Sequence, residues 1–291
     1  MALMFGFLVC ISCNSKSGKK KEKEPSLFSQ QSTNYDLVHP TKTLVLSDSL
    51  AEISGIVFTK NGRLLAIEDL HPIIYELKVE ESSAMIVNKI EFKQTDKEKF
   101  DFEDLAVVDD TVYALWSHGA IFKIIDQKGG ATSERKKTWL KKENNTEGLA
   151  YDPLSGNLLV ACKDDAGLQD EKKSTRAIYE FDMKADSLKT NPFMLINKKD
   201  FENVAGEKID FYPAAIAVHP ITHDIFIIST KDTKCIAQFT HDGKLKAFDY
   251  LEKEMLPQPE GICFDKNGNL YISTEARHGK KPFIYEFAVK K

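Results

Sequence analysis

Residues 257–274, near the end of the chain, read PQPEGICFDKNGNLYIST. A Glu-Gly pair, Glu260 and Gly261, opens a short apolar stretch, which an Asp-Lys-Asn-Gly turn separates from a second apolar stretch. Two apolar stretches of this length on either side of a glycine-containing turn are typical of paired β-strands. An acidic residue therefore stands at the start of what looks like a buried strand, and this raises the question of whether the pattern recurs.

Four other segments repeat this pattern. They read ISGIVFTKNGRLLAIED, FEDLAVVDDTVYALWSHG, TEGLAYDPLSGNLLVACKDD and PAAIAVHPITHDIFIISTKD. We call the first residues that align across the five segments the aligned positions; they are Ser54, Glu103, Glu147, Ala214 and Glu260. Their spacings of 49, 44, 67 and 46 residues are close to the ~40–50 residues of a propeller blade with four strands.

Each segment is followed by a third strand with alternating polarity, such as IIYELKV, and by a more variable fourth strand. The first two strands are continuously apolar and should be covered on both faces, whereas the third should lie nearer the surface. We therefore predict an all-β fold, a five-bladed β-propeller, with a six-bladed ring as the alternative. The long third spacing includes residues 197–213, where a short helix is expected.

The last repeat ends after its third strand, at Lys291. We expect the N-terminal segment 36–47 to supply the missing outer strand by pairing with residues 283–289. This pairing would close the ring and leave no open sheet edge.

The N-terminus differs from the rest of the chain. MALMFGFLVCISC is apolar for 13 residues, which is too short to span a membrane and resembles a secretory signal. Ser12 before Cys13 resembles the lipobox of bacterial lipoproteins, in which the cysteine becomes diacylated. We predict a signal and lipobox over 1–13, a disordered polar tether over 14–33 and a propeller domain over 34–291. An ordinary signal peptide and a disordered cytosolic tail are the alternatives.

The lipobox resemblance implies attachment to a membrane of the bacterial cell envelope, with the outer membrane or cell surface favoured over the inner membrane. The composition, 42% hydrophobic and 29% charged with a net charge of -4, is that of an ordinary globular protein and offers no basic surface for a nucleic-acid partner. We expect a monomer. Cys162, Cys235 and Cys263 lie in apolar runs and should be buried free thiols, so a structural zinc site is not expected.

Three of the repeat units resemble the SdiA-regulated family of bacterial β-propellers. They are Glu52-Ile-Ser-Gly-Ile56, Thr146-Glu-Gly-Leu-Ala150 and Gln258-Pro-Glu-Gly-Ile262. The resemblance covers roughly residues 45–290 and implies a propeller, but no established biochemical activity. The pattern is more distantly similar to gluconolactonase and strictosidine synthase propellers. That similarity implies a set of acidic residues at the channel mouth that binds calcium or serves catalysis.

The first strand of a propeller blade lines the central channel, so residues at its start should gather at one mouth of the channel. The candidate carboxylates of this kind are Glu52, Glu103, Glu147 and Glu260. Asp104 should point aside. The second strand runs back to the same mouth, and the residues that follow it are Asp69, His118, Asp164, Lys231 and Glu275.

Carboxylates that converge repel one another, and a bound cation would relieve this repulsion. Calcium, which takes 6–8 oxygen ligands, is the candidate cofactor, while zinc and copper are not expected because His118 is the one soft ligand available. Alternatively, the carboxylates cap backbone amides between neighbouring blades, or they form a catalytic site.

Two functions remain open. The first is a lipid-anchored, non-enzymatic propeller that binds a small-molecule, cation or protein ligand at its acidic mouth. The second is a calcium-dependent hydrolase of lactonase, phosphodiesterase or phytase type. A hydrolase needs a general base that is poised near neutral pH, and the sequence offers His118 and Lys231 for that role.

Overall fold

The computed structural model describes residues 32–93, 99–126, 130–169, 174–277 and 279–290. The predicted signal, Cys13 and residues 14–31 of the predicted tether lie outside these ranges. Strands dominate the described chain, and its helical segments are α1 (Glu202–Ala205) and the 3-10 turns η1 (Asp48–Leu50), η2 (Lys142–Asn144) and η3 (Lys198–Phe201). In the ranges given, we find no helix with the length and apolar character needed to cross a membrane.

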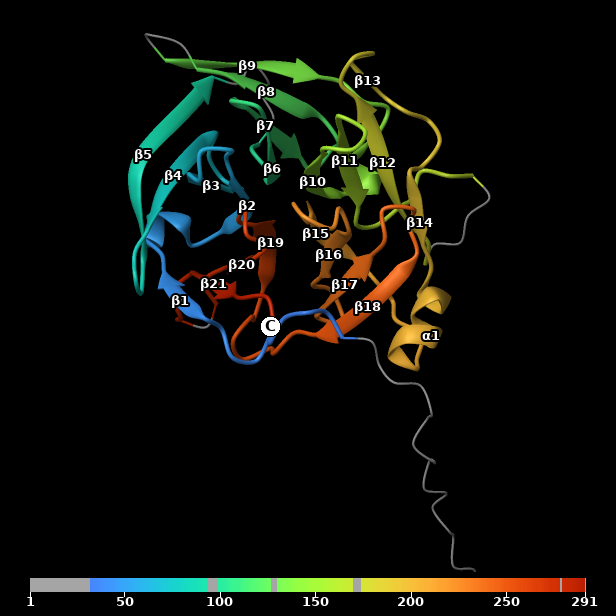
Figure 1. Ribbon diagram of the computed structural model, residues 1–291. Helices are drawn as coiled ribbons and strands as arrows, with labels where there is room; N and C mark the ends of the chain where they lie inside the picture. The colour runs from blue at the N-terminus through green and yellow to red at the C-terminus, as the bar shows by residue number, and fades with distance from the viewer. Residues whose placement is uncertain (1–31, 94–98, 127–129, 170–173, 278, 291) are drawn as a thin grey trace, which may run out of the picture.

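The strands form antiparallel meanders, in which most strands pair with the next one along the chain (Figure 1). One meander contains β2 (Ile53–Phe58), β3 (Leu64–Glu68), β4 (Ile73–Val79) and β5 (Ala84–Lys93). The next contains β6 (Phe102–Val108), β7 (Thr111–Trp116), β8 (Ile121–Ile125) and β9 (Ala131–Lys136). The third contains β10 (Thr146–Asp152), β11 (Asn157–Cys162), β12 (Arg176–Asp182), β13 (Ser187–Leu188) and β14 (Met194–Ile196). Then follow β15 (Pro213–Val218), β16 (Ile225–Ser229), β17 (Cys235–Phe239) and β18 (Leu245–Tyr250). The last contains β19 (Pro259–Phe264), β20 (Leu270–Thr274) and β21 (Phe283–Phe287), with β1 (Lys42–Val45) at its edge.

The meanders stand around a common centre, as expected for a propeller-like fold (Figure 1). Their first strands, β2, β6, β10, β15 and β19, contact one another in this order, and β19 contacts β2. At one end of the channel these strands surround an apolar cavity of about 240 Å³. The outer strands β5 and β9 also pair in parallel over two residues, which joins the first two meanders into one eight-stranded sheet.

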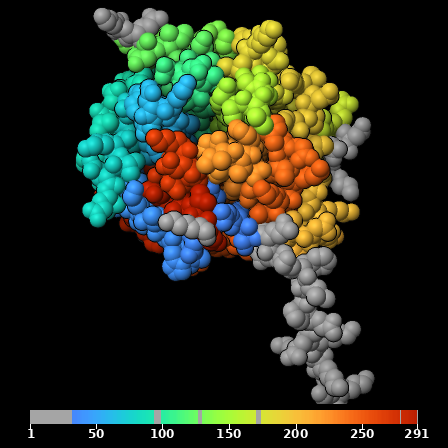
Figure 2. Space-filling view, in the orientation of Figure 1, coloured from blue at the N-terminus to red at the C-terminus, as the bar shows by residue number. Residues whose placement is uncertain are grey.

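The hydrophobic core lies between neighbouring meanders, which pack side by side around the centre (Figure 2). Ile67 of β3, for example, shares a buried cluster with Phe102 of β6 and Trp116 of β7. Four other clusters join the remaining pairs of neighbours in the same way. The apolar first and second strands therefore bury both faces, as their continuous hydrophobic sequence predicts.

The first strands begin at the residues where the repeated segments begin, so the repeat pattern located them correctly. The surface position expected for the third strands is wrong for β12 and β17, which are buried along almost their whole length. Ile196 of β14 and Phe201 of η3 share a cluster with Ile178 of β12 and Ala237 of β17. The long insertion thus covers these strands, and it contains the expected short helix, α1.

The predicted pairing of the N-terminal segment with the last strand is confirmed. β1 runs antiparallel to β21, with Lys42 opposite Glu286 and Val45 opposite Phe283. The Lys42 ammonium also lies 2.9 Å from a carboxylate oxygen of Glu286. The outermost strand of the last meander therefore comes from the opposite end of the chain.

Residues before β1 are also packed against the ring. Tyr35 forms a bridge with Val289. Thr33 is 2% exposed, and its backbone N–H donates to Asp249 Oδ2 at 2.7 Å. The packed part of the chain therefore includes Thr33, which the sequence pattern had assigned to the tether.

Candidate binding site at the channel mouth

Each aligned position lies at a β-bulge. In the pairing of β6 with β7, Phe102 is opposite Trp116 and Asp104 is opposite Leu115, so Glu103 is the extra residue. The same shift occurs at Glu147 in β10, at Ala214 in β15 and at Glu260 in β19. The pairing of β2 with β3 is irregular across Ser54 and Gly55. A bulge redirects a side chain that would otherwise follow the pleat of the sheet, so it is the feature that sets the direction of these carboxylates.

The ends of the second strands meet the starts of the first strands at the same end of the ring. The backbone N–H of Asp69 donates to the carbonyl of Glu52 at 3.4 Å. Equivalent bonds join Lys163 to Asn145 at 2.9 Å and Glu275 to Gln258 at 3.1 Å. We call this end the mouth, and its charged residues are Glu52, Asp69, Asp101, Glu103, Glu147, Lys163, Lys234, Glu260, Glu275 and Arg277.

Glu103, Glu147 and Glu260 come from three meanders and act on one another electrostatically. Burial raises the pKa of Glu147 from 4.5 to about 7; Lys163 opposes this rise and the charge of Glu260 adds to it. Burial also raises the pKa of Glu103 well above its ordinary range, with repulsion from Glu147, Asp101 and Glu260 adding to the effect. Burial raises the pKa of Glu260, although Lys163 opposes it. The three carboxyl groups therefore share one poorly solvated region.

Lys163, which the sequence reasoning did not select, is the cation at the centre of this region. Its ammonium forms an ion pair with Glu147, whose other oxygen accepts from Asn145 Nδ2 at 2.7 Å. Burial alone would lower the pKa of Lys163, but Glu147, Glu260 and Glu103 outweigh burial and raise it. The mouth is therefore a mixed cluster of carboxylates around a lysine, rather than a purely acidic ring.

A second group of carboxylates adjoins the first. Burial raises the pKa of Asp69 to about 6, helped by Glu52 and Glu68. Burial raises the pKa of Glu275 to about 8, helped by Glu260 and Glu52. Among the described residues, Asp69 Oδ1 and Glu275 Oε2 are buried atoms without a hydrogen-bond partner, although Arg277 lies 3.3 Å from the latter. This part of the mouth has spare capacity to accept hydrogen bonds.

Two basic side chains stand beside Glu260 and Glu275. Burial lowers the pKa of Lys234, although the charge of Glu260 opposes this shift, and its ammonium donates to the Thr230 carbonyl at 3.2 Å. Arg277 lowers the pKa of both Glu260 and Glu275. A pocket of about 290 Å³ with apolar walls that include Met255 and Phe283 also has Glu275 in its lining.

Among the residues selected after the second strands, Asp164 adjoins the carboxylate group, because the Asn145 side chain that donates to Glu147 also donates to Asp164 Oδ2 at 3.2 Å. His118 stacks on Trp116, with ring centroids 4.8 Å apart. Asp164 and Lys231 form an exposed ion pair at 3.4 Å, and the Lys231 ammonium lies 4.5 Å from the centroid of the Tyr212 ring. Lys231 is therefore joined to the carboxylate group through Asp164 and Asn145.

The residues selected after the second strands do not occupy equivalent positions. Asp69 and Glu275 are the first residues after β3 and β20, but His118, Asp164 and Lys231 are the second residues after their strands. Neighbouring side chains in an extended segment point in opposite directions. Counting each position from the end of its strand would have selected Lys163 in place of Asp164.

The glycine after the acidic residue has a steric role. A Cβ on Gly261 would lie 2.5 Å from the carbonyl oxygen of Ser54, and one on Gly148 would lie 2.8 Å from Cγ2 of Ile216. Ser54 and Ile216 belong to first strands of neighbouring meanders. The repeated glycine therefore permits the close approach of first strands around the channel.

Asp104 occupies the position of that glycine in β6, and its carboxylate lies among backbone amides of the first strands rather than among the glutamates of the mouth. It is 1% exposed, and its carboxylate accepts from the backbone N–H groups of Leu105 and Leu149, each at 2.8 Å. A Cβ on Gly55 would lie 2.3 Å from Asp104 Oδ1. The neighbouring glycine thus makes room for a carboxylate that bonds amides of adjacent first strands, which is the amide-capping role expected for the glutamates.

The described residues contain no group of three or more His, Cys, Asp or Glu side chains arranged to hold a metal ion. The carboxylates of the mouth come close enough to repel one another, but Lys163 supplies positive charge where calcium was expected. Cys162, Cys235 and Cys263 are buried free thiols, as predicted.

Solved structures with a similar fold include several enzymes. Glutaminyl cyclase of Myxococcus xanthus is 12% identical, with a TM-score of 0.59 over 86% of this chain and 95% of the other. A calcium structure of Trichoderma reesei carbohydrate-active enzymes family AA12 is 10% identical, with a TM-score of 0.52 over 89% and 96%. The gluconolactonase XC5397 of Xanthomonas campestris is 15% identical, with a TM-score of 0.47 over 85% of each chain. At these identities the similarity concerns the fold alone.

The sequence itself matches no curated protein. It does match the family model described as SdiA-regulated, over residues 28–277. This match includes all five aligned positions and spans most of the chain. The chain therefore belongs to the SdiA-regulated family.

Proposed function

We propose that this protein is a ligand-binding propeller whose mouth takes a small molecule with a cationic group. The observation that carries the proposal is the crowding of Glu103, Glu147 and Glu260 around Lys163, with the pKa of all three carboxyl groups raised. Poorly solvated carboxylates gain more from an incoming cation than exposed ones do. The mouth therefore favours a ligand that adds positive charge.

An organic cation fits this site better than calcium. Calcium takes 6–8 oxygen ligands at short distances, and the Lys163 ammonium lies among the carboxylates that would have to surround the ion. An ammonium group needs two or three acceptors. Asp69 Oδ1 is a buried oxygen without a hydrogen-bond partner among the described residues, and Glu275 Oε2 has only the Arg277 guanidinium at 3.3 Å beside it. Met255 and Phe283 beside Glu275 offer apolar surface for the rest of the ligand, in a pocket whose lining also includes Lys280 and Lys281.

The test is calorimetric titration of the purified protein with 1,4-diaminobutane and, separately, with calcium chloride. Because bound cations compete with protons on carboxyl groups of raised pKa, diamine affinity should increase about tenfold from pH 6 to pH 8. Glu260→Gln should weaken binding about tenfold, while Glu91→Gln, at an exposed position of β5, should leave it unchanged. Equal binding by the wild type and Glu260→Gln would contradict the proposal.

A calcium-dependent hydrolase is the second candidate, because the pKa of Asp69 is raised to about 6 and that of Glu147 to about 7. Groups poised near neutral pH are suited to general acid–base catalysis. Chromogenic lactone and phosphodiester substrates, with calcium or with chelator, test this function. A calcium-dependent hydrolase should turn over one of these substrates, lose the activity with chelator and regain it with calcium. Asp69→Asn should abolish the activity.

We also propose a ring of five blades rather than six. Five first strands follow one another around the centre, and each begins one repeated segment; they are β2, β6, β10, β15 and β19. The parallel pairing between β5 and β9 involves only two residue pairs, so we interpret it as a contact between two separate blades. A crystal structure with a sixth four-stranded unit would contradict the count.

We further propose that Cys13 carries lipid and anchors the protein to a membrane of the cell envelope. The support is the sequence alone, with Ser12-Cys13 after the apolar run and a polar tether behind it. Two or three acyl chains, at ~0.8 kcal/mol per buried methylene, hold a protein firmly. Cys13→Ser should move the protein from the membrane fraction to the soluble fraction; Cys10→Ser is the matched control and should not.

A further inference from the structure

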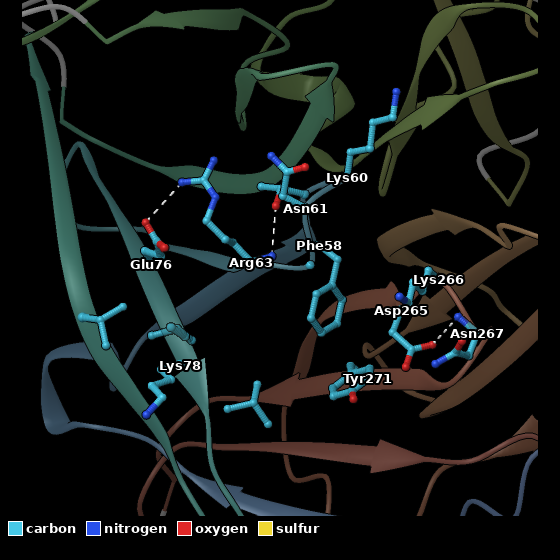
Figure 3. A pocket seen from close by; sticks show the side chains of 15 residues that line it. Phe58, Lys60, Asn61, Arg63, Glu76, Lys78, Asp265, Lys266, Asn267 and Tyr271 are labelled. Carbon is cyan, nitrogen blue, oxygen red and sulfur yellow. Dashed lines mark hydrogen bonds and ion pairs between the residues drawn. The ribbon is translucent and has the colours of Figure 1, made fainter.

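A larger pocket lies at the other end of the ring from the mouth. It has a volume of about 790 Å³ and opens between the β2–β5 meander and the β19–β21 meander. Its walls include the β2–β3 turn, with Lys60 and Asn61, and the β19–β20 turn, with Lys266 and Asn267 (Figure 3). These turns follow the first strands, whereas the mouth lies where these strands start, roughly 17 Å away for a strand of this length. The pocket is therefore separate from the site proposed above.

The floor of the pocket is aromatic. Phe58 and Tyr271 lie with ring centroids 4.9 Å apart at an interplanar angle of 72°. The Tyr271 hydroxyl already donates to Glu286 at 2.8 Å. Tyr271 is 5% exposed and supports Phe58 from below. Phe58 is partly exposed and stands between the two walls (Figure 3).

Both acidic groups of the lining are engaged within the protein. Glu76 pairs with Arg63 at 3.2 Å. Asp265 accepts from the backbone N–H groups of Asn267 and Asn269 and from the Asn269 side chain, each at 2.9 Å. The carboxylates therefore have little capacity left to bind a ligand.

The polar side chains available on the two turns are those of two lysines, which donate hydrogen bonds, and of two asparagines. Within the described residues, neither Lys60 nor Lys266 takes part in an ion pair or a side-chain hydrogen bond. Asn61 and Asn267 are exposed, and their amides can both donate to and accept from a ligand. Hydroxyl groups are complementary to such amides because they also donate and accept.

We propose that this pocket binds an anionic sugar, one that carries a phosphate or a carboxylate. The apolar face of a pyranose ring packs on Phe58, and its hydroxyls bond Asn61 and Asn267. The anionic group lies between Lys60 and Lys266, where charge-assisted hydrogen bonds are the stronger kind. The pocket volume falls within the range of ~300–1,000 Å³ that is usual for small-molecule sites.

The test is titration of the purified full-length protein with glucose 6-phosphate, glucuronate, glucose and inorganic phosphate. At least one anionic sugar should bind about tenfold more tightly than both glucose and inorganic phosphate. The double variant Lys60→Gln/Lys266→Gln should lose about tenfold in affinity for that sugar. Lys137→Gln, at an exposed position outside both sites, should retain it, and so should Glu260→Gln in the mouth.

Each alternative result would overturn the proposal. Equal affinity for the sugar phosphate and for inorganic phosphate would mean that the pyranose ring contributes nothing to binding. Equal affinity for glucose and for the anionic sugars would mean that the lysines contribute nothing to binding. Binding that Glu260→Gln abolishes and the lysine variant retains would assign the ligand to the mouth, and absence of binding by every probe would leave no anionic-sugar site.

Discussion

Glu275 is 8% exposed and lies beside Glu260 and Glu52 at the mouth. Burial, with repulsion from these two carboxylates, raises its pKa from 4.5 to about 8. A carboxyl group whose pKa is higher in the folded state binds its proton more tightly there than in the unfolded chain. The contribution of Glu275 to the free energy of unfolding is therefore fully present below about pH 4.5 and is lost as the pH rises to about 8.

Glu275→Gln should remove this dependence, because glutamine does not titrate. At pH 8 the variant should be more stable than the wild type by about 1–3 kcal/mol, and at pH 5 the two should be nearly equal. Urea unfolding at several pH values measures the difference, with Glu91→Gln as the control. A difference that is the same at pH 5 and pH 8 would mean that the charge of Glu275 is not the cause.

At the scale of elements, β1 determines whether the last meander is complete. It supplies the fourth strand beside β21, and Leu44 is fully buried in the cluster between the first and last meanders. Without β1, the backbone groups of β21 that face it would have no partner. An exposed strand edge of this kind also invites pairing between molecules.

Removing residues 1–47 should therefore lower the melting temperature by more than about 10 °C or prevent folding, whereas removing residues 1–31 should leave it unchanged. Leu44→Ala should cost about 2–5 kcal/mol. The neighbouring side chain of Val45 is 37% exposed, so Val45→Ala should cost well under half as much. Equal melting temperatures for the two truncations would contradict the closure role of β1.

At the scale of the whole molecule, Asp104 links separate meanders through the centre of the ring. Its carboxylate accepts from Leu105 in its own strand, from Leu149 in β10 and from Ile216 in β15. Burial raises its pKa well above the ordinary range, although these three backbone bonds oppose the shift.

Asp104→Ala should thus destabilise the whole domain by about 2–4 kcal/mol, because it leaves buried amides of three first strands without an acceptor. Asp104→Asn retains one acceptor oxygen and should cost less. Chemical unfolding measures both variants, with the exposed Asp110→Ala as the control. If Asp104→Ala matched that control, the central carboxylate would have no stabilising role.

The sequence by itself determined the strands, their order and the closure of the ring. Continuous apolar runs specify strands that are buried on both faces, and turns such as Asp265–Gly268 specify where the chain reverses. These are local patterns repeated five times, and repetition made them recognisable. The acidic positions Glu103, Glu147 and Glu260 are part of the same repeat, so the sequence pattern also predicted their place at the start of the first strands.

Only the tertiary structure decided what surrounds those carboxylates. A bulge sets the direction of each glutamate, and a shift of one residue after the second strand decides that Lys163, rather than Asp164, stands among them. The inward position of Asp104 depends on the space left by Gly55, a residue of a different meander. Charge, burial and pKa at the mouth arise from residues that are distant in the chain, so no local pattern contains them.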